Sequence, residues 1–465
     1  MQLEVDYLVI GSGAMGMAFT DVLVTETKAT VALIDRHHQP GGHWNDAYPY
    51  VRLHQPSAFY GVNSRPLGND SIDTSGWNKG LYELATNSEV VAYFDAVMNQ
   101  QFLPTGRVSY FPSCEYTGNG KFRSLLSGVQ YQAKAGKIVD ATYMNVTVPA
   151  IQPPAYEVSS SAQCIPPNEL PKQGANAYVV IGGGKTGMDA CLFLLKNDVA
   201  PEKIRWIMPR DSWILDRAHI QPGDQFKESI GQLATQQAKD LAAAKTVDDL
   251  FQRAEQSGNL LRLDPSVQPT MFRCATVTQA ELEQLRRIDG IIRMGRVQRI
   301  DETTIHLDTG SIETTPDTVH VDCSADGLAC RPSVPVFSEE TITLQSVRTC
   351  QQVFSAAFIA HVEAAYTGET EKNKLCTPVP HPDTDIDFIR TNLADHWNRT
   401  RWAQDADLSN WLKRSRLDGF SETDESQAPL STEMQAELQA ILEIMQQAAV
   451  NAQRLLATDD STRSS

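Results

Sequence analysis

The chain has 465 residues, of which 41% are hydrophobic, and a formal net charge of −17. This length exceeds what one hydrophobic core usually supports, so we expect two or three domains. The negative charge argues against nucleic acid or an anionic membrane surface as a partner, because both would repel the chain. The first glycine motif starts at Gly11, leaving no room for a signal peptide, and no run of about eighteen apolar residues occurs, so we expect a cytoplasmic protein.

The first candidate binding motif lies near the N-terminus. A predicted strand over residues 7–10 runs into the turn "GSGAMG", a helix follows, and a second strand over residues 30–34 ends at an aspartate. The glycines of such a turn let the backbone approach a pyrophosphate, and the helix N-terminus attracts phosphates. A carboxylate at the end of the second strand can accept both hydroxyls of an adenosine ribose. The pattern predicts an adenine dinucleotide site, rather than a purely structural turn, with the residues Gly11, Gly13, Ala14, Met15, Gly16, Asp35 and Arg36.

A second motif, "VVIGGGKTGMDACLFLLKN", has two possible interpretations. Gly184-Lys185-Thr186 could end a P-loop, but that pattern requires a glycine at position 179, where Val179 stands. The same letters fit G-x-G-x-x-G as Gly182, Gly184 and Gly187, between a predicted strand and a predicted helix. This context predicts a second dinucleotide site rather than an ATPase site.

The second unit differs from the first at the end of its second strand. Here the strand closes with Pro209-Arg210 and carries no carboxylate. An arginine can pair with a ribose 2′-phosphate, which favours NADPH over NADH, although Arg210 could also be a solvated surface residue. Lys185, Thr186 and Arg217 are possible further contacts. Two such sites on one chain imply electron transfer between two cofactors, with FAD at the first and NADPH at the second.

The stretch "PGGHWNDAYPY" leads to a resemblance. With the order and separation of the two glycine motifs, it is similar to class B flavoprotein monooxygenases, which include flavin-containing, Baeyer–Villiger and N-hydroxylating enzymes. In that family a Gly-Gly-x-Trp sequence and a nearby Tyr-Pro run along the flavin, and Gly41-Gly42-His43-Trp44 and Tyr48-Pro49 match them. Residues 321–328, "VDCSADGL", resemble the strand that returns the chain to the FAD domain. The similarity touches most of residues 5–330.

The resemblance implies an α/β fold with two Rossmann-like dinucleotide-binding domains, the FAD domain being discontinuous. It further implies a monooxygenase that uses FAD, NADPH and molecular oxygen to oxygenate a small metabolite through a flavin C4a-hydroperoxide. The family's F-x-G-x-x-x-H and Ala-Thr-Gly motifs are missing, as is the asparagine near the flavin. An NAD(P)H:acceptor oxidoreductase or oxidase that inserts no oxygen therefore stays open, as does a scaffold that holds FAD structurally.

The candidate pocket residues follow the first unit. His54 could donate or accept a proton near neutral pH, and Gln55 could hydrogen-bond the flavin edge, although both could be structural. Asp326 is a candidate contact of the flavin ribityl chain. Further candidates for the flavin site and pocket are Gly42, His43, Trp44, Tyr48 and Arg52.

The predicted organisation places a first FAD-binding part at residues 1–148, a proline-rich linker at 149–174 and the NAD(P)H-binding domain at 175–320. A helical insertion at about 223–290 either covers the substrate pocket or forms a plain helical layer. It includes a capping pair, Thr246 and Asp249. Residues 321–420 return to the FAD domain, and the tail at 421–465 contains an amphipathic helix. Substrate identity and oligomeric state stay open.

Eight cysteines are scattered along the chain, and no two form C-x-x-C. This spacing excludes a thioredoxin-reductase-like redox motif and gives no zinc ligand set. We therefore expect free, mostly buried thiols and no metal.

Overall fold

The computed structural model describes residues 1–419 and 432–463. Its first sheet joins distant parts of the chain, and every pair among its strands is parallel except those that involve β4 and β5. The spatial order is β3 (Val108–Phe111), β2 (Val31–Ile34), β1 (Gln2–Ile10), β6 (Gln130–Asp140), β5 (Lys121–Ser124) and β4 (Cys114–Gly118), with β21 (Thr341–Thr343) beside β6.

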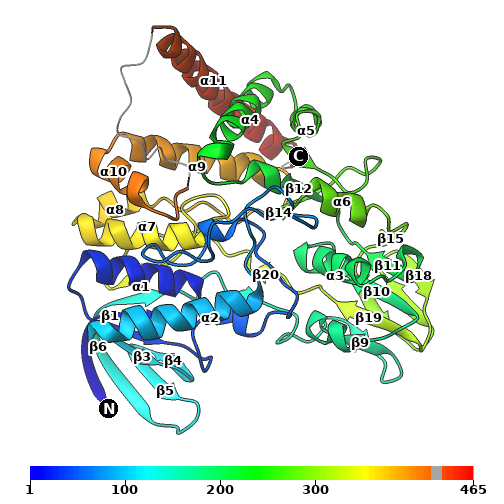
Figure 1. Cartoon of the computed structure of the whole chain (residues 1–465), viewed down its shortest axis with the longest axis horizontal. Helices are drawn as coiled ribbons and strands as arrows, with labels where there is room; N and C mark the ends of the chain where they lie inside the picture. Colours follow the sequence, from blue (N-terminus) through cyan, green and yellow to red (C-terminus); the bar gives the residue numbers. More distant parts are fainter. Residues whose placement is uncertain (420–431, 464–465) are drawn as a thin grey trace.

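Helices cover one face of this first sheet. Helix α1 (Ala14–Glu26) follows β1 directly and packs beside α7 (Gln352–Ala365), as Figure 1 shows. Both helices are apolar on nearly all sides, which fits their burial between the sheet and further helices. The other face of the sheet is covered by its own β4–β5 hairpin through Leu8, Ile34 and Phe122.

The second sheet repeats the design with parallel strands throughout. Its order is β15 (Gly290–Ile292), β11 (Ile204–Ile207), β10 (Ala177–Ile181), β19 (Thr318–Asp322) and β9 (Gln163–Ile165). Helices α3 (Lys185–Lys196) and α6 (Gln279–Leu285) share a core with one face. The other face packs on a sheet made of β18 (Gly310–Glu313), β17 (Thr304–Leu307), β16 (Val297–Ile300) and β8 (Glu157–Val158). The predicted α/β fold with two Rossmann-like units is confirmed.

A smaller sheet and a helical layer complete the molecule. The sheet consists of β13 (Leu260–Leu261), β12 (Ser212–Asp216) and β14 (Met271–Val277), and a two-stranded ladder joins β20 (Gly327–Leu328) to β7 (Val146–Thr147). The remaining helices are α2 (Asn87–Val97), α4 (Asp224–Ala243), α5 (Val247–Gln256), α8 (Glu369–Leu375), α9 (Asp387–Ala403), α10 (Ala406–Arg414) and α11 (Thr432–Arg463). Single turns of 3₁₀ or π type lie at Gly42–Asn45, Ser57–Phe59, Met98–Phe102, Leu103–Thr105, Pro167–Lys172, Pro201–Lys203 and Arg217–His219.

Two segments differ from their predicted character. The region predicted as a linker contributes β8 and β9 to the sheets of the second unit, because residues 155–165 are free of proline and can pair. The predicted helical insertion contains α4 and α5 but also β13 and β14. The sequence "MFRCATV" of β14 is rich in residues that favour strands and is largely buried beside β12. Thr246 caps α5 as predicted by accepting from the Asp249 amide.

The C-terminal helix is only partly docked. The predicted tail boundary at residue 421 lies outside the described residues, and α11 continues to Arg463. Ala448, Ala452 and Leu455 are buried where α11 meets α4 and α9, whereas Leu438 and Leu442 are exposed. The domain boundaries themselves stay predictions.

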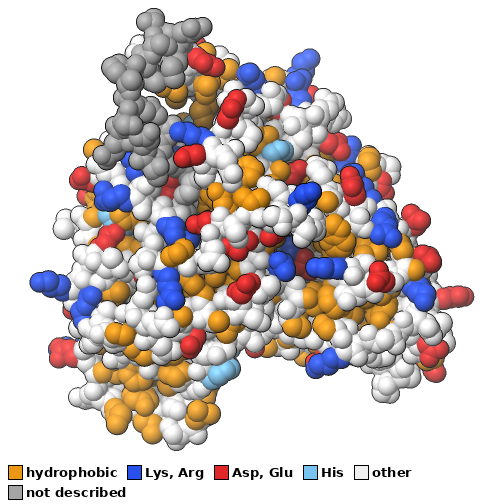
Figure 2. Space-filling view, in the orientation of Figure 1, with side chains coloured by type: hydrophobic (Ala, Val, Ile, Leu, Met, Phe, Trp, Pro, Cys, Tyr) orange, Lys and Arg blue, Asp and Glu red, His pale blue; other side chains and the backbone are white. Residues whose placement is uncertain are grey.

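The distribution of surface charge and the character of the helices bear on possible partners. Acidic and basic side chains are interspersed over the face in Figure 2 rather than separated by sign. Across residues 1–419 and 432–463, we find no helix that combines the length and apolar character needed to cross a bilayer.

Candidate functional site

The first glycine turn connects β1 to α1 and forces them close together. Gly11 has a φ of +99°, a backbone conformation that suits glycine. A Cβ atom on Gly16 would overlap the carbonyl oxygen of Gly11, so only glycine lets α1 begin here. A Cβ on Gly42 would lie 2.8 Å from the Cα of Gly13, so the Gly-Gly-x-Trp segment packs directly on the turn.

Asp35 lies at the end of β2, beside the first turn. Its carboxylate accepts hydrogen bonds from the Ser12 amide (2.5 Å) and hydroxyl (2.8 Å) and from the His37 amide (2.8 Å). The His37 ring joins Asp35 (Nδ1, 2.9 Å) to Asp46 (Nε2, 2.7 Å). Burial alone would raise the pKa of Asp35, but these hydrogen bonds outweigh it and lower the pKa. The hydrogen bond to Asp35, helped by Asp46, raises the pKa of His37 to about 9 despite partial burial.

The second turn reproduces the backbone of the first. Gly182 has a φ of +125°, and a Cβ on Gly187 would overlap the Gly182 carbonyl oxygen. Trp206 donates from its indole nitrogen to that same oxygen at 2.8 Å. A Cβ on Gly184 would meet no described atom within 4 Å, so this glycine faces open space. The amides at the start of α3 are thus free to approach a bulky anion such as a pyrophosphate.

The strand end of the second unit carries paired charges that sequence reasoning missed. Arg210 donates to both carboxylate oxygens of Asp383 (2.9 and 3.2 Å), and Arg273 donates to the same carboxylate at 2.7 Å. Asp211 is buried and bound by Arg293 at 2.8 and 2.9 Å. Asp383 lies 173 residues beyond Arg210 in the chain, and no local pattern could have joined them.

The two turns face one cavity of about 1000 Å³. Its walls come from the carboxyl ends of strands in both sheets, where ligands bind in open α/β sheets. The predicted site residues that line it are Gly11, Gly13, Ala14, Met15, Asp35, Arg36, Gly42, His43, Trp44, His54, Gln55, Gly182, Gly184, Lys185, Thr186, Arg210 and Asp326. Tyr48 and Arg52 also line it, whereas Gly16 and Gly187 lie behind their turns in α1 and α3.

Side chains of the first unit contact helix α3 of the second unit beside the cavity. The Tyr48 hydroxyl donates to Asp189 of α3 at 2.7 Å, and Lys185 pairs with the same carboxylate. The ring of Tyr50 stacks on Phe193 with centroids 4.2 Å apart. The first unit therefore binds directly to the helix that starts at the second glycine turn.

His54 is held as a neutral imidazole. Burial lowers its pKa well below the ordinary value, and the positive charges of Lys185 and Arg217 lower it further. Arg217 was a possible further contact of NADPH, but the residue is 1% exposed and does not line the cavity. It donates to the His54 carbonyl oxygen at 2.8 Å and pairs with Glu281 at 2.9 Å, so it anchors the His54 loop instead.

The aromatic wall beside His54 is also largely uncharged. Burial lowers the pKa of His43 to about 4, and its ring contacts that of Trp44. Trp44 donates from its indole nitrogen to the Tyr60 hydroxyl at 2.6 Å, which fixes both rings at the cavity wall. The wall can therefore exclude water while offering few charges to a bound ring system.

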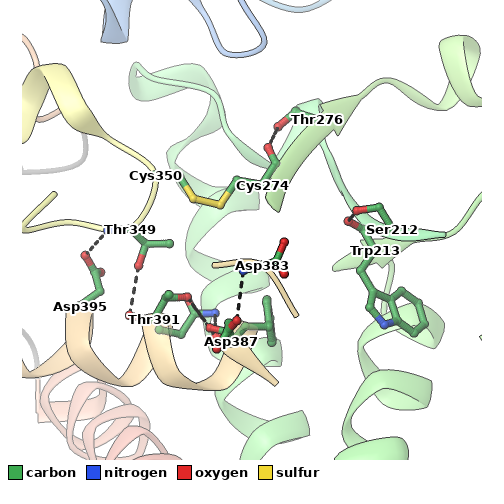
Figure 3. Close-up of a disulfide and its surroundings, with 12 residues drawn as sticks. Ser212, Trp213, Cys274, Thr276, Thr349, Cys350, Asp383, Asp387, Thr391 and Asp395 are labelled. Atoms are coloured by element: carbon green, nitrogen blue, oxygen red, sulfur yellow. Dashed lines mark hydrogen bonds between the residues drawn. A yellow bond between two sulfur atoms is a disulfide. The ribbon is translucent and has the colours of Figure 1, made fainter. Parts of the chain in front are cut away.

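The prediction of free thiols is wrong for two cysteines. Cys274 and Cys350 form a disulfide that lines the same cavity (Figure 3). They are 76 residues apart and come from different elements, so their spacing gave no sign of pairing. The other six cysteines are free. Within the described part of the chain, no group of three or more His, Cys, Asp or Glu residues is arranged to hold a metal ion.

Known proteins are similar to this chain both in the first unit and over most of its length. Residues 9–61 match the family model of an NAD(P)-binding Rossmann-like domain. The uncharacterized protein Rv2000 of Mycobacterium tuberculosis is 59% identical over 421 residues, which cover 89% of this chain and 78% of that protein. The chain belongs to the Rv2000 family. The Mycobacterium bovis member, uncharacterized protein Mb2023, shows the same identity and coverage.

Solved flavin monooxygenases are similar to this member of the Rv2000 family. The flavin-containing monooxygenase from Stenotrophomonas maltophilia is 16% identical, with 86% of this chain and 99% of that chain covered and a TM-score of 0.40. Cyclohexanone-bound cyclohexanone monooxygenase is 13% identical, with 80% and 88% covered and a TM-score of 0.48. Oxidized steroid monooxygenase bound to NADP is 13% identical, with 78% and 85% covered and a TM-score of 0.48.

Proposed function

We propose that the chain is an FAD-dependent monooxygenase that uses NADPH and molecular oxygen to oxygenate a small molecule. The observation that carries the proposal is the pair of glycine turns with matching backbone geometry that face one cavity. One turn suits one dinucleotide, and two turns on one cavity suit two dinucleotides whose reactive rings meet. The similarity of "GGHW" and Tyr48-Pro49 to class B enzymes supports FAD as one of them.

The residues present fit both cofactors. The first turn and Asp35 would hold the pyrophosphate and adenosine ribose of FAD, with the Gly42 segment and Trp44 along the ring. The open cradle at Gly184, with Lys185, Thr186 and Arg210, would hold NADPH. When bound, FAD would take a hydride from NADPH and pass electrons to oxygen, one atom of which enters the substrate.

The chain's own residues define the reaction space. His54, neutral near physiological pH, can donate one hydrogen bond and accept another without bringing a charge into the cavity. Gln55 adds an amide that can do the same. The aromatic side chains of Trp44, Phe59 and Tyr60 give part of the cavity an apolar wall, and a drier reaction space favours oxygen insertion over release of hydrogen peroxide.

An anaerobic titration followed by air tests the proposal. The purified chain should be yellow or take up added FAD, and NADPH should bleach it faster than NADH does. After air is admitted, NADPH oxidation should couple to product formation with a suitable small nucleophile or ketone. A colourless chain that takes up no FAD contradicts the proposal at its root. Stoichiometric peroxide release that no substrate suppresses contradicts oxygen insertion and favours an oxidase.

A further inference from the structure

The Cys274–Cys350 disulfide lines the cavity that both candidate cofactor sites share. Cys274 is on β14, in the smaller sheet, and Cys350 lies two residues before the start of α7 of the first unit. Both cysteines line the cavity that the two glycine turns face. Figure 3 shows the bridge between the strand that carries Cys274 and the segment that leads to Thr349 and Cys350. A two-electron acceptor thus forms part of the cavity wall.

The segments that carry the two cysteines are also fixed by hydrogen bonds that do not involve the disulfide. Two backbone hydrogen bonds join the segment before α9 to the start of β14. The Phe272 amide donates to the Asp383 carbonyl oxygen at 3.2 Å, and the Asp385 amide donates to the Thr270 carbonyl oxygen at 3.3 Å. Thr349 is fixed to α9 through its amide to Asp395 (3.1 Å) and its hydroxyl to the Thr391 carbonyl (3.1 Å). The S–S bond can therefore break while the wall stays assembled, as a cycling redox pair requires.

The backbone at both cysteines is strained. Cys274 and Cys350 each have a φ of +55°, in the left-handed region. The other described non-glycine residues with positive φ are aspartate, asparagine or serine, whose side chains tolerate this conformation in turns. Cysteine is not among the residues that favour this conformation, and non-glycine residues held in it cluster at functional sites.

We propose that Cys274–Cys350 is a redox-active disulfide that takes up two electrons from the reduced dinucleotide bound in the same cavity. The inference rests on the proposed function, because the electrons come from NADPH through the FAD site. In the overall reaction, NADPH loses a hydride and becomes NADP⁺, the S–S bond breaks, and two S–H groups form with one proton from solvent. The chain thereby holds a second pair of reducing equivalents beside the one on FAD.

Counting thiols tests the proposal without relying on turnover. The chain, oxidised and loaded with FAD, is denatured under acid quench, alkylated and weighed by mass spectrometry. It should carry six labels, one for each free cysteine, and eight after anaerobic reduction with NADPH. In parallel, complete reduction should consume about two equivalents of NADPH per FAD in the wild type. It should consume about one in the double variant Cys274→Ser with Cys350→Ser.

Cys330→Ser is the matched control. Cys330 is exposed and its sulfur lies 4.0 Å from Nη2 of Arg273, the neighbour of Cys274 in the chain, but it takes no part in the bridge. This variant should lose one label in both states and still consume about two equivalents of NADPH. The label count needs only the wild-type chain, so a double variant that fails to fold does not weaken the test.

Each contrary outcome has a distinct meaning. Bleaching of the flavin by NADPH with six labels before and after overturns the redox disulfide and leaves the proposed function standing. Eight labels in the oxidised chain show that no bridge forms and overturn the inference alone. Failure to take up FAD overturns both.

Discussion

The two glycine turns share one backbone design but differ in what surrounds them. In both, a glycine with positive φ ends the first strand, and a helical glycine packs on its carbonyl oxygen. The first turn is backed by a second glycine pair, since Gly42 packs on Gly13, whereas Gly184 of the second turn faces open space. We propose that each turn binds one dinucleotide, and that the atoms around it decide whether the cofactor stays bound or exchanges.

The ends of the second strands differ in charge as well. Asp35 is buried, ionised and tied to a histidine whose pKa is about 9. Arg210 is partly exposed and shares Asp383 with Arg273. We propose that a ribose with free hydroxyls binds at the first end and a phosphorylated ribose at the second, so that one side chain in each unit selects the nucleotide.

The largest expected effect comes from the glycine that both units share. Gly16→Ala and Gly187→Ala should each destabilise the fold by about 1–3 kcal/mol, because the new methyl overlaps a backbone carbonyl oxygen and the helix must shift. Urea unfolding measures this, and each variant should also lose its own cofactor. Gly231→Ala in α4 is the control, since its Cβ meets no described atom within 4 Å and the change should stabilise slightly. Equal stability of all three variants would show that Gly16 and Gly187 are not required for close packing at the two turns.

Gly184→Ala and Gly13→Ala separate binding from folding. Both residues have extended backbone that alanine adopts, and neither new methyl has a contact shorter than 3.5 Å. Melting temperatures should therefore stay near that of the wild type. The methyl on residue 184 would occupy the phosphate approach, so affinity for NADPH in calorimetry should fall about 10–100-fold, or about 1.4–2.8 kcal/mol. Unchanged NADPH affinity would remove the second turn from the proposed site.

Arg210→Ala tests selectivity at the second strand end. Removing the guanidinium should weaken NADPH binding about tenfold and leave NADH binding nearly unchanged, because only NADPH carries the 2′-phosphate. Asp383→Asn is the informative partner, since it frees Arg210 from a competing carboxylate and should keep or improve NADPH affinity. Stopped-flow flavin reduction with each nucleotide gives both constants. An equal loss for the two nucleotides would assign Arg210 a structural role.

Short sequence motifs predicted those parts of the site that neighbouring residues in the chain form together. The strand–turn–helix order and the ends at Asp35 and Arg210 follow from sequence spacing alone, and their elements are present. Partners brought together by tertiary folding could not be found this way. Three such pairs join elements that are distant in the chain: Asp383 with Arg210, Arg217 with the His54 carbonyl, and Cys350 with Cys274. Strand β14, which supplies Cys274, lies in a region where the helical patterns on either side dominated the sequence prediction.

The smallest expected effect tests the charge pair of the first unit. The folded-state pKa of His37, about 9, exceeds its ordinary value of 6.5, so the charged ring stabilises the fold fully below pH 6.5 and this stabilisation disappears as the pH rises through 9. His37→Gln should therefore cost about 1 kcal/mol at pH 6, after allowance for solvent screening, and close to nothing above pH 9. Unfolding midpoints from pH 5.5 to 9.5 measure the difference. His306→Gln removes an exposed contact with Asp301 outside the cavity and should change stability little at every pH, so a similar profile for both variants would show that the Asp35 end has no special electrostatic role.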